Sequence, residues 1–407
     1  MIDALLAGIP ASELAAEYGT PLVVYDLDEI DLAIDTLTRA FIARGITVAY
    51  AAKAFLCVAL VEALAATPLW LDVCSLGELR TAESGGFPAG RIYFHGCGKT
   101  DEELRAIAAG RVAFGVVDNI EEIERLAAFA PGDARCEVVL RINTGIEAHT
   151  HEYIRTAGGN TKFGISLADV PAVLARIAAH PALHLIGLHA HVGSQIAETA
   201  PYVDNLALLI EQANQARAAG HPIELLIAGG GMGVEETPGE SAPLDLETLA
   251  GQLAATGAGT PYRLAIEPGR AIVARAGTSL YRVMAIKSQA GRRFAIVDGG
   301  MADNPRPAIY GASHEFEVLT SAASGAPVEA VLCGRSCEND VLGTVRVPSD
   351  LRAGDLVALR TTGAYTYSMA SNYNRFSRPA VVFARDGSHR LAVRRESADD
   401  TLRNDIR

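Results

Sequence analysis

Four kinds of residue in this sequence could act together on a carbonyl compound. Lys53 lies in the apolar stretch YAAKAFLC, where burial would lower the pKa of its amine and leave it able to attack a carbonyl carbon. Glu267 could pair its carboxylate with a cationic ring, and His191 could lie against the face of that ring. The run IAGGGMGV (227–234) lacks the Gly-Lys-Ser/Thr ending of a nucleotide P-loop, but its backbone N–H groups could hold a phosphate.

Each of these features also has an ordinary interpretation when it is taken alone. The lysine could extend from its strand into solvent, the histidine could be a core residue bonded to the backbone, and the glycines could form a simple turn. The choice between the interpretations therefore depends on the elements that position the residues.

Apolar runs alternate with amphipathic segments between residues 27 and 276, which predicts parallel strands separated by helices. Eight such units in about 250 residues are typical of a (β/α)8 TIM-like barrel, whose functional groups gather at the carboxyl ends of the strands. Lys53, His191, the glycines and Glu267 each follow an expected strand, so we expect them to converge on one mouth. The expected strands are 47–52, 70–73, 91–95, 112–117, 137–142, 185–190, 223–228 and 263–267, and the expected helices are 28–43, 58–66, 77–86, 101–109, 120–129, 168–179, 203–219 and 244–255.

After residue 276 the helical periodicity weakens, and short apolar runs separated by Gly, Pro, Asp and Ser predict a second, all-β domain. We expect the barrel to span 27–276 and the all-β domain to combine 1–26 with 277–407, with the strand 21–25 joining it. The expected strands there are 279–289, 292–298, 328–333, 341–347, 356–361 and 389–395.

Composition narrows the class of protein. The 407 residues include 35 basic and 48 acidic side chains, for a net charge of −13, so we expect no nucleic-acid or anionic-membrane partner. We expect neither a signal peptide nor a membrane-spanning helix, and a cytoplasmic protein. No metal site is expected, because the pairs His149/His151 and His189/His191 lack metal-ligand context. The scattered cysteines, which we expect to be free thiols, are Cys57, Cys74, Cys97, Cys136, Cys333 and Cys337.

A lysine amine, a phosphate-binding turn and a carboxylate for a ring nitrogen, all at one barrel mouth, favour pyridoxal 5′-phosphate as cofactor. Its aldehyde needs the lysine, its phosphate needs backbone donors, and its pyridine nitrogen needs a charged partner such as Glu267.

With these motifs the sequence resembles the diaminopimelate decarboxylase family, within the fold-type III, alanine-racemase-like barrels that use pyridoxal phosphate. The matching motifs occur in order along nearly the whole chain, and the ordered set is far more specific than any single match. They include YAAKAFLC (50–57), GLHAHVGSQI (187–196), GGGMG (229–233), EPGRAIV (267–273), DNPRPAIYGA (303–312), CGRSCENDVL (333–342) and GAYTYSMASNYN (363–374).

The resemblance implies roles for individual residues. Lys53 would hold the cofactor's aldehyde, His191 would stack on its ring, and Cys337 would return a proton to the carbon that loses CO2. The cofactor-binding set that it implies is Lys53, Asp72, His191, Ser194, Gly229, Gly230, Gly231, Glu267, Gly269, Arg270 and Tyr365. The substrate-binding set is Arg270, Arg306, Tyr310, Glu338 and Tyr365.

Two loops depart from the family pattern. Residues 95–100 read HGCGKT where relatives usually have asparagines after His-Gly, and Asn339 stands where a Ser-Gly pair is usual, which shortens that loop by one residue.

The expected reaction is decarboxylation of meso-2,6-diaminopimelate to L-lysine and CO2. The guanidinium of Arg306 could bind the distal carboxylate of this substrate in bidentate fashion, and Glu338 could hold the distal ammonium. Without the family motif, Arg306 would equally suit a surface ion pair. The alternative function is a decarboxylase of the same fold that acts on ornithine, arginine, lysine or a related amino acid. The resemblance also implies a homodimer in which the Cys337–Glu338 segment completes the partner's active site.

Overall fold

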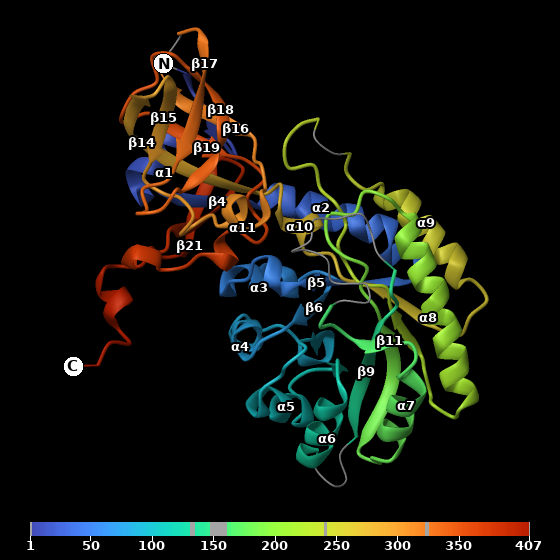
Figure 1. The fold of residues 1–407 in the computed structure, drawn as a ribbon. Helices are drawn as coiled ribbons and strands as arrows, with labels where there is room; N and C mark the ends of the chain where they lie inside the picture. Colours follow the sequence, from blue (N-terminus) through green and yellow to red (C-terminus); the bar gives the residue numbers. More distant parts are fainter. Residues whose placement is uncertain (1, 131–134, 147–160, 240–241, 322–324, 407) are drawn as a thin grey trace. The chain divides into compact units, whose positions relative to one another are not determined.

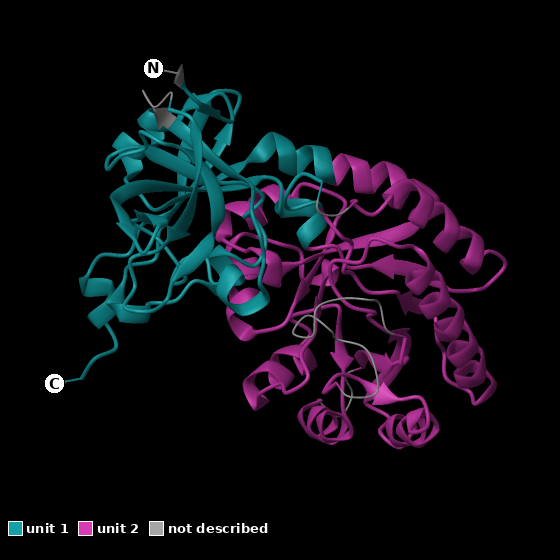
Figure 2. Ribbon diagram, turned by 45° about the horizontal axis from the view of Figure 1, so that its top comes forward, with its two compact units in different colours: residues 1–33, 235–241, 270–407 teal, residues 34–234, 242–269 magenta. Residues whose placement is uncertain are grey.

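The computed structural model describes residues 2–130, 135–146, 161–239, 242–321 and 325–406, arranged as two compact units (Figures 1 and 2). Unit 1 comprises residues 1–33, 235–241 and 270–407, and unit 2 comprises residues 34–234 and 242–269. The division differs from the expected one at three places, since residues 27–33, 235–241 and 270–276 are grouped with unit 1. The expected domain boundaries themselves stay a prediction.

Unit 2 is a closed parallel barrel, as the sequence predicted. Each strand pairs in parallel with the next, and the last pairs with the first, so the described strands leave no open edge in the ring. Its strands are β5 (Ile46–Ala51), β6 (Trp70–Val73), β7 (Ile92–Phe94), β8 (Phe114–Val117), β9 (Cys136–Asn143), β11 (Leu183–His189), β12 (Leu225–Ile227) and β13 (Arg263–Ile266), with the short β10 (Ile165–Ser166) beside β9.

Helices follow the barrel strands at the positions expected from the sequence. Side-chain caps fix the starts of some of them: Ser75 accepts the backbone N–H of Glu78, and Thr100 forms a capping box with Glu103. The helices are α2 (Leu27–Ala40), α3 (Val58–Ala65), α4 (Leu76–Ser84), α5 (Asp101–Ala108), α6 (Ile120–Phe129), α7 (Val170–Ala178), α8 (Ala200–Ala218) and α9 (Leu246–Gly257), with 3₁₀ turns at Ile42–Arg44, Ala52–Ala54 and Ala89–Arg91.

The barrel interior is filled by apolar side chains from neighbouring strands, among them Ala49, Val139, Ile227 and Ala265. Tyr93 of β7 belongs to the same cluster and is fully buried. A packed interior holds the strand ends in fixed positions, which is the condition for a precise site at the mouth.

Unit 1 is built around a mixed sheet in which most strand pairs are antiparallel, which confirms the expected all-β domain. The early strand β4 (Leu22–Asp26) joins it, pairing antiparallel with β14 (Gly277–Gln289) and parallel with β20 (Ala380–Arg385). The sheet also contains β1 (Ile2–Asp3), β15 (Arg292–Val297), β16 (Phe316–Ser321), β17 (Pro327–Cys333), β18 (Val341–Pro348), β19 (Leu356–Leu359) and β21 (Ser388–Val393), and β2 (Leu5–Leu6) pairs with β3 (Ile9–Pro10).

Short helices and turns complete unit 1. They are α1 (Ala11–Tyr18), α10 (Arg270–Val273), α11 (Arg306–Tyr310) and the 3₁₀ turns Tyr367–Met369, Tyr373–Arg375 and Asp399–Leu402. In the part of the chain that the structure describes, no helix has the length and apolar character needed to cross a membrane. None of the six cysteines, all of them described, takes part in a disulfide bond.

Candidate active site

Polar side chains and a glycine turn of unit 2 gather at the carboxyl ends of the barrel strands. Because all these strands are parallel, their carboxyl ends share one face of the barrel. The residues concerned are Lys53 after β5, Asp72 in β6, His95 after β7, His189 and His191 at and after β11, Gly229–Gly231 after β12, and Glu267 after β13.

The carboxylate of Glu267 lies at the centre of a buried hydrogen-bond network. Its Oε1 atom accepts from the Tyr93 hydroxyl at 2.9 Å and lies 2.8 Å from Nε2 of His95. Its Oε2 atom lies 3.0 Å from Nε2 of His189. A carboxylate has about four acceptor positions, so these three donors leave Glu267 able to accept one more N–H group.

The protonation states of this network follow from burial. Burial alone would raise the pKa of Glu267, but the hydrogen-bonding imidazoles of His189 and His95 outweigh it and hold that pKa well below its usual value. Burial lowers the pKa of His189 to about 4, so its imidazole is neutral at pH 7 and donates through Nε2. Its Nδ1 atom is buried, with no hydrogen-bond partner among the described residues. Glu267 is therefore an ionised carboxylate, and the His189 imidazole that donates to it is neutral.

His191 contacts the glycine turn and is held in one orientation. Its Nδ1 atom accepts the backbone N–H of Gly230 at 3.0 Å, which leaves Nε2 to carry the proton. Burial, followed by the positive charges of Lys53 and Arg141, lowers the pKa of His191 well below its usual value. The ring is neutral and fixed, as a group that stacks on a planar ligand needs to be.

The turn Gly229–Gly231 has no room for side chains. A Cβ on Gly230 would lie 1.9 Å from the carbonyl oxygen of Glu267, and one on Gly231 would lie 2.0 Å from that of Gly193. Gly229 and Gly231 also have φ values of 78° and 94°, which favour glycine. The turn thus presents bare backbone at the barrel mouth beside the half-buried Ser194.

Lys53 corrects one expectation. Its neighbours Ala52 and Ala54 are buried, but Lys53 itself is exposed, so the expected burial of its amine is wrong. The residue lies in a 3₁₀ turn beyond the end of β5 rather than inside the strand, and its side chain is not enclosed by the barrel. Its positive charge opposes the burial that raises the pKa of Asp72 to about 7, which places the amine within electrostatic reach of that carboxyl.

The same network contains a group of ligand atoms that could hold a metal ion. Among the described residues, His95, His189 and Glu267 bring such atoms within 4.8 Å of one another. Their mutual hydrogen bonds account for this closeness without an ion. The pair His149/His151 lies outside the described residues.

Unit 1 brings together three of the predicted substrate residues. Arg270 and Arg306, at the starts of α10 and α11, are buried and both pair with the carboxylate of Glu236. The guanidinium of Arg270 also lies 4.9 Å from the ring centre of Tyr365. The hydroxyl of Tyr310 lies 3.9 Å from the sulfur of Met369.

Cys337 and Glu338 lie in an exposed loop of unit 1. The backbone N–H of Cys337 donates to the Asn374 side chain at 3.1 Å, and Glu338 accepts from the Tyr373 hydroxyl at 2.6 Å. Asp340, at the end of this loop, is buried. Both side chains are thus accessible to solvent.

Two residues beside these groups were not predicted from the sequence. Tyr93 lies inside a short apolar strand and resembled a core residue, while Glu236 lies in a loop with no motif. His95 ends the third expected strand, and this position places it among the polar groups expected at the barrel mouth.

The residues of unit 2 fit pyridoxal 5′-phosphate. The donor set matches each part of that cofactor: an amine for the aldehyde, a buried carboxylate with one acceptor position left for the ring nitrogen, and a side-chain-free turn for the phosphate. The turn would be filled by any added Cβ, so its shape requires glycine. Gly269, also in the predicted set, is buried two positions after Glu267.

Comparison with known proteins agrees with this chemistry. Residues 27–274 match the family described as pyridoxal-dependent decarboxylase, pyridoxal binding domain. A diaminopimelate decarboxylase from Actinosynnema pretiosum is 43% identical over 416 residues, covering 99% of this chain and 93% of that protein. One from Mycobacterium bovis is 40% identical over 428 residues, covering 99% and 94%.

A solved structure shows the same likeness in three dimensions. The diaminopimelate decarboxylase of M. jannaschii, in complex with L-lysine, superimposes with a TM-score of 0.92 at 29% identity, covering 100% of this chain and 97% of that one. With a buried carboxylate, imidazoles and a glycine turn at one barrel mouth, and with relatives of this identity along nearly its whole length, the chain belongs to the diaminopimelate decarboxylase family of pyridoxal-dependent decarboxylases.

Proposed function

We propose that this protein decarboxylates meso-2,6-diaminopimelate to L-lysine and CO2. The observation that carries the proposal is the buried Arg270–Glu236–Arg306 cluster, because a distal carboxylate requires a positively charged partner and the two guanidiniums outnumber the one carboxylate. The relatives named diaminopimelate decarboxylase support the same substrate.

Pyridoxal 5′-phosphate, when bound, supplies an aldehyde that takes up an amine and a ring that accepts the electron pair left by departing CO2. Lys53 is the amine that would hold the aldehyde. Glu267 keeps a negative charge where the ring nitrogen needs one, since its pKa lies well below the usual value. Gly229–Gly231, Ser194 and Gly269 would surround the phosphate.

The neutral ring of His191 would lie against the cofactor. The backbone N–H of Gly230 fixes this imidazole through Nδ1, so the ring needs no rearrangement when the ligand arrives. A neutral imidazole also adds no second positive charge beside a ring nitrogen that Glu267 would keep protonated. His191 therefore acts by orientation and contact rather than by proton transfer.

Proton return is assigned to Cys337. Its thiol is exposed on unit 1, together with the carboxylate of Glu338. An exposed proton donor suits an active site completed by a second copy of the chain, so we propose a homodimer with shared sites. A reducing, cytoplasmic location fits a protein whose six cysteines form no disulfide.

The test is product analysis with meso-diaminopimelate, with and without added pyridoxal phosphate. We expect L-lysine and CO2 only with the cofactor. The variant Lys53→Ala should lose both the product and the visible absorbance band of the bound cofactor, whereas a retained band would refute the lysine assignment. Preference for ornithine, arginine or lysine over diaminopimelate would establish the alternative substrate class instead.

A further inference from the structure

Glu236 forms a buried ion-pair cluster with the two arginines of unit 1. Its Oε1 atom lies 2.9 Å from Nη2 of Arg306, and its Oε2 atom lies 3.0 Å from the same nitrogen. Oε1 also contacts Nη1 of Arg270. The side chains are only 11%, 4% and 7% exposed for Glu236, Arg306 and Arg270, so the three charges are held close together away from water.

The cluster has unused capacity for an anion. Within the described residues, Nε and Nη1 of Arg306 and Nε of Arg270 are buried without a hydrogen-bond partner. Leaving buried donors unpaired costs free energy, so an arriving carboxylate would be stabilised there. The two guanidiniums also outweigh the single carboxylate by one positive charge, which favours a second anion.

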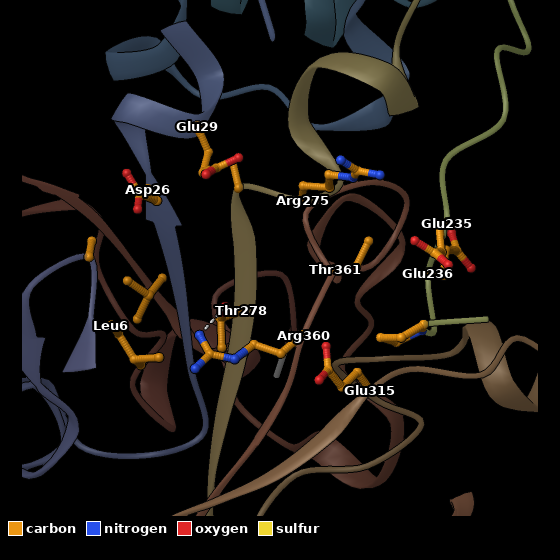
Figure 3. Close-up of a pocket in the computed structure, with 14 residues that line it drawn as sticks. Leu6, Asp26, Glu29, Glu235, Glu236, Arg275, Thr278, Glu315, Arg360 and Thr361 are labelled. Atoms are coloured by element: carbon orange, nitrogen blue, oxygen red, sulfur yellow. Dashed lines mark hydrogen bonds between the residues drawn. The ribbon is translucent and has the colours of Figure 1, made fainter. Parts of the chain in front are cut away.

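Glu236 also faces a cavity that favours cations. The cavity lies within unit 1 and has a volume of about 480 Å³. Figure 3 shows Glu235 and Glu236 next to each other on one segment at its edge. The other charged residues that line it are Asp26, Glu29, Glu315, Arg275 and Arg360. Carboxylates outnumber guanidiniums, and the charge of Arg360 is offset by its ion pair with Glu317.

The arginines therefore suit an anion, and the carboxylates around the cavity suit a cation. Together they fit a ligand that carries an ammonium and a carboxylate on the same carbon. We propose that Glu236 is a specificity-determining residue that binds the distal ammonium of the substrate while the neighbouring Arg306 binds the distal carboxylate. The inference rests on the proposed function, since it concerns the end of diaminopimelate that does not react. A substrate with only an amine or only a carboxylate at that end would satisfy one half of the pair.

Glu236 differs in this respect from Glu338, which the family resemblance assigns to the distal ammonium. Glu338 is exposed and already accepts a hydrogen bond from Tyr373. Glu236 is mostly buried and adjoins the guanidinium that would hold the distal carboxylate. The ammonium and carboxylate of one α-carbon lie close together, so adjacent partners on one subunit suit them.

The product allows a binding test that is separate from catalysis. L-Lysine retains the distal amino-acid end of the substrate, and 6-aminohexanoate is the same molecule without the α-ammonium. The wild-type holoenzyme should bind L-lysine at least about tenfold more tightly than 6-aminohexanoate, as expected for a hydrogen bond between charged groups. Titration calorimetry or competition with substrate would give both dissociation constants.

The decisive variant is Glu236→Gln, which keeps the shape and removes the charge. It should weaken binding of L-lysine about tenfold and leave binding of 6-aminohexanoate unchanged, so the preference disappears. Glu235→Gln is the matched control on the same segment, where the carboxylate accepts only the backbone N–H of Gly239 among its described contacts. Glu236→Asp, which keeps the charge, should retain part of the preference, and it serves the test if the Gln variant does not fold.

Three results would overturn the inference. Equal weakening of both ligands in Glu236→Gln would mean that Glu236 only positions Arg306, and tighter 6-aminohexanoate binding would mean that Glu236 competes with the ligand carboxylate. Complete loss of the preference in a folded Glu236→Asp would also contradict it. Formation of lysine by the wild-type enzyme is measured in parallel, because its absence refutes the proposed function and not the role of Glu236.

Discussion

The variant Glu267→Gln tests whether an ionised carboxylate is needed at the centre of the barrel mouth. Three donors point at Glu267, from Tyr93, His95 and His189. The glutamine oxygen can still accept two of them, but its NH2 group would face Nε2 of His189. That imidazole can move its proton to Nδ1, which has no partner among the described residues. Because glutamine is neutral, the variant keeps these contacts but removes the charge that strengthens all three hydrogen bonds, a loss of about 1.5–3 kcal/mol in all.

Glu267→Leu gives the contrast, because it leaves all three donors buried and unpaired. At about 1–3 kcal/mol for each unpaired donor, its loss of unfolding free energy should clearly exceed that of the glutamine variant. Urea unfolding followed by circular dichroism measures both. Turnover of Glu267→Gln should fall on the order of 100-fold, the usual effect of removing one preorganised electrostatic partner. Wild-type turnover in this variant, or equal stability losses in the two variants, would refute the reasoning.

Three further predictions concern other parts of the chain. Cys337→Ala should bind cofactor normally but release lysine slowly; wild-type turnover would reassign the proton donor. Lys99→Met removes a buried ammonium that contacts Glu122 at 3.1 Å. The variant should lose about 3–5 kcal/mol of unfolding free energy, because the buried carboxylate of Glu122 is left without its cation. A urea midpoint like that of the wild type would contradict this. Burial raises the pKa of Asp72 from 3.8 to about 7, so the folded state favours the protonated carboxyl. The stability that this preference gives is present at low pH and is lost as the pH rises across that range. The stability of Asp72→Asn relative to the wild type should therefore increase between about pH 4 and pH 7, and a constant difference in unfolding free energy across that range would refute the assignment.

Much of the fold could be predicted because the barrel repeats one local pattern. Each apolar run is buried on both faces and each helix has one apolar side, so periodicity identifies both. In unit 1, β16 (Phe316–Ser321) and β20 (Ala380–Arg385) were not named from the sequence. Their places depend on pairing with distant strands, which local periodicity does not report.

The site was predictable only where chemistry and strand ends coincide. Glu267, His191 and the glycines follow strands, and barrel geometry brings strand ends together. Tyr93 contributes through its hydroxyl from inside a strand, where an aromatic residue usually indicates core packing.

Other features of the structure depend on long-range contacts that no local spacing reveals. Lys99 and Glu122 form a buried ion pair, with the ammonium also donating to the carbonyl oxygens of Gly96 and Val116 at 2.7 Å. Glu236 meets Arg306 across 70 positions of sequence. The exposure of Lys53 was misjudged because apolar neighbours in sequence do not guarantee that a side chain is enclosed.

The pairing of β4 has a consequence for biosynthesis. This strand, Leu22–Asp26, is almost entirely buried between β14 and β20, and β20 ends only at Arg385. As the ribosome releases the chain from its amino end, the apolar β4 emerges long before either neighbour exists. Such an unpaired edge is prone to aggregate, so the nascent polypeptide must keep this segment protected until translation is nearly finished.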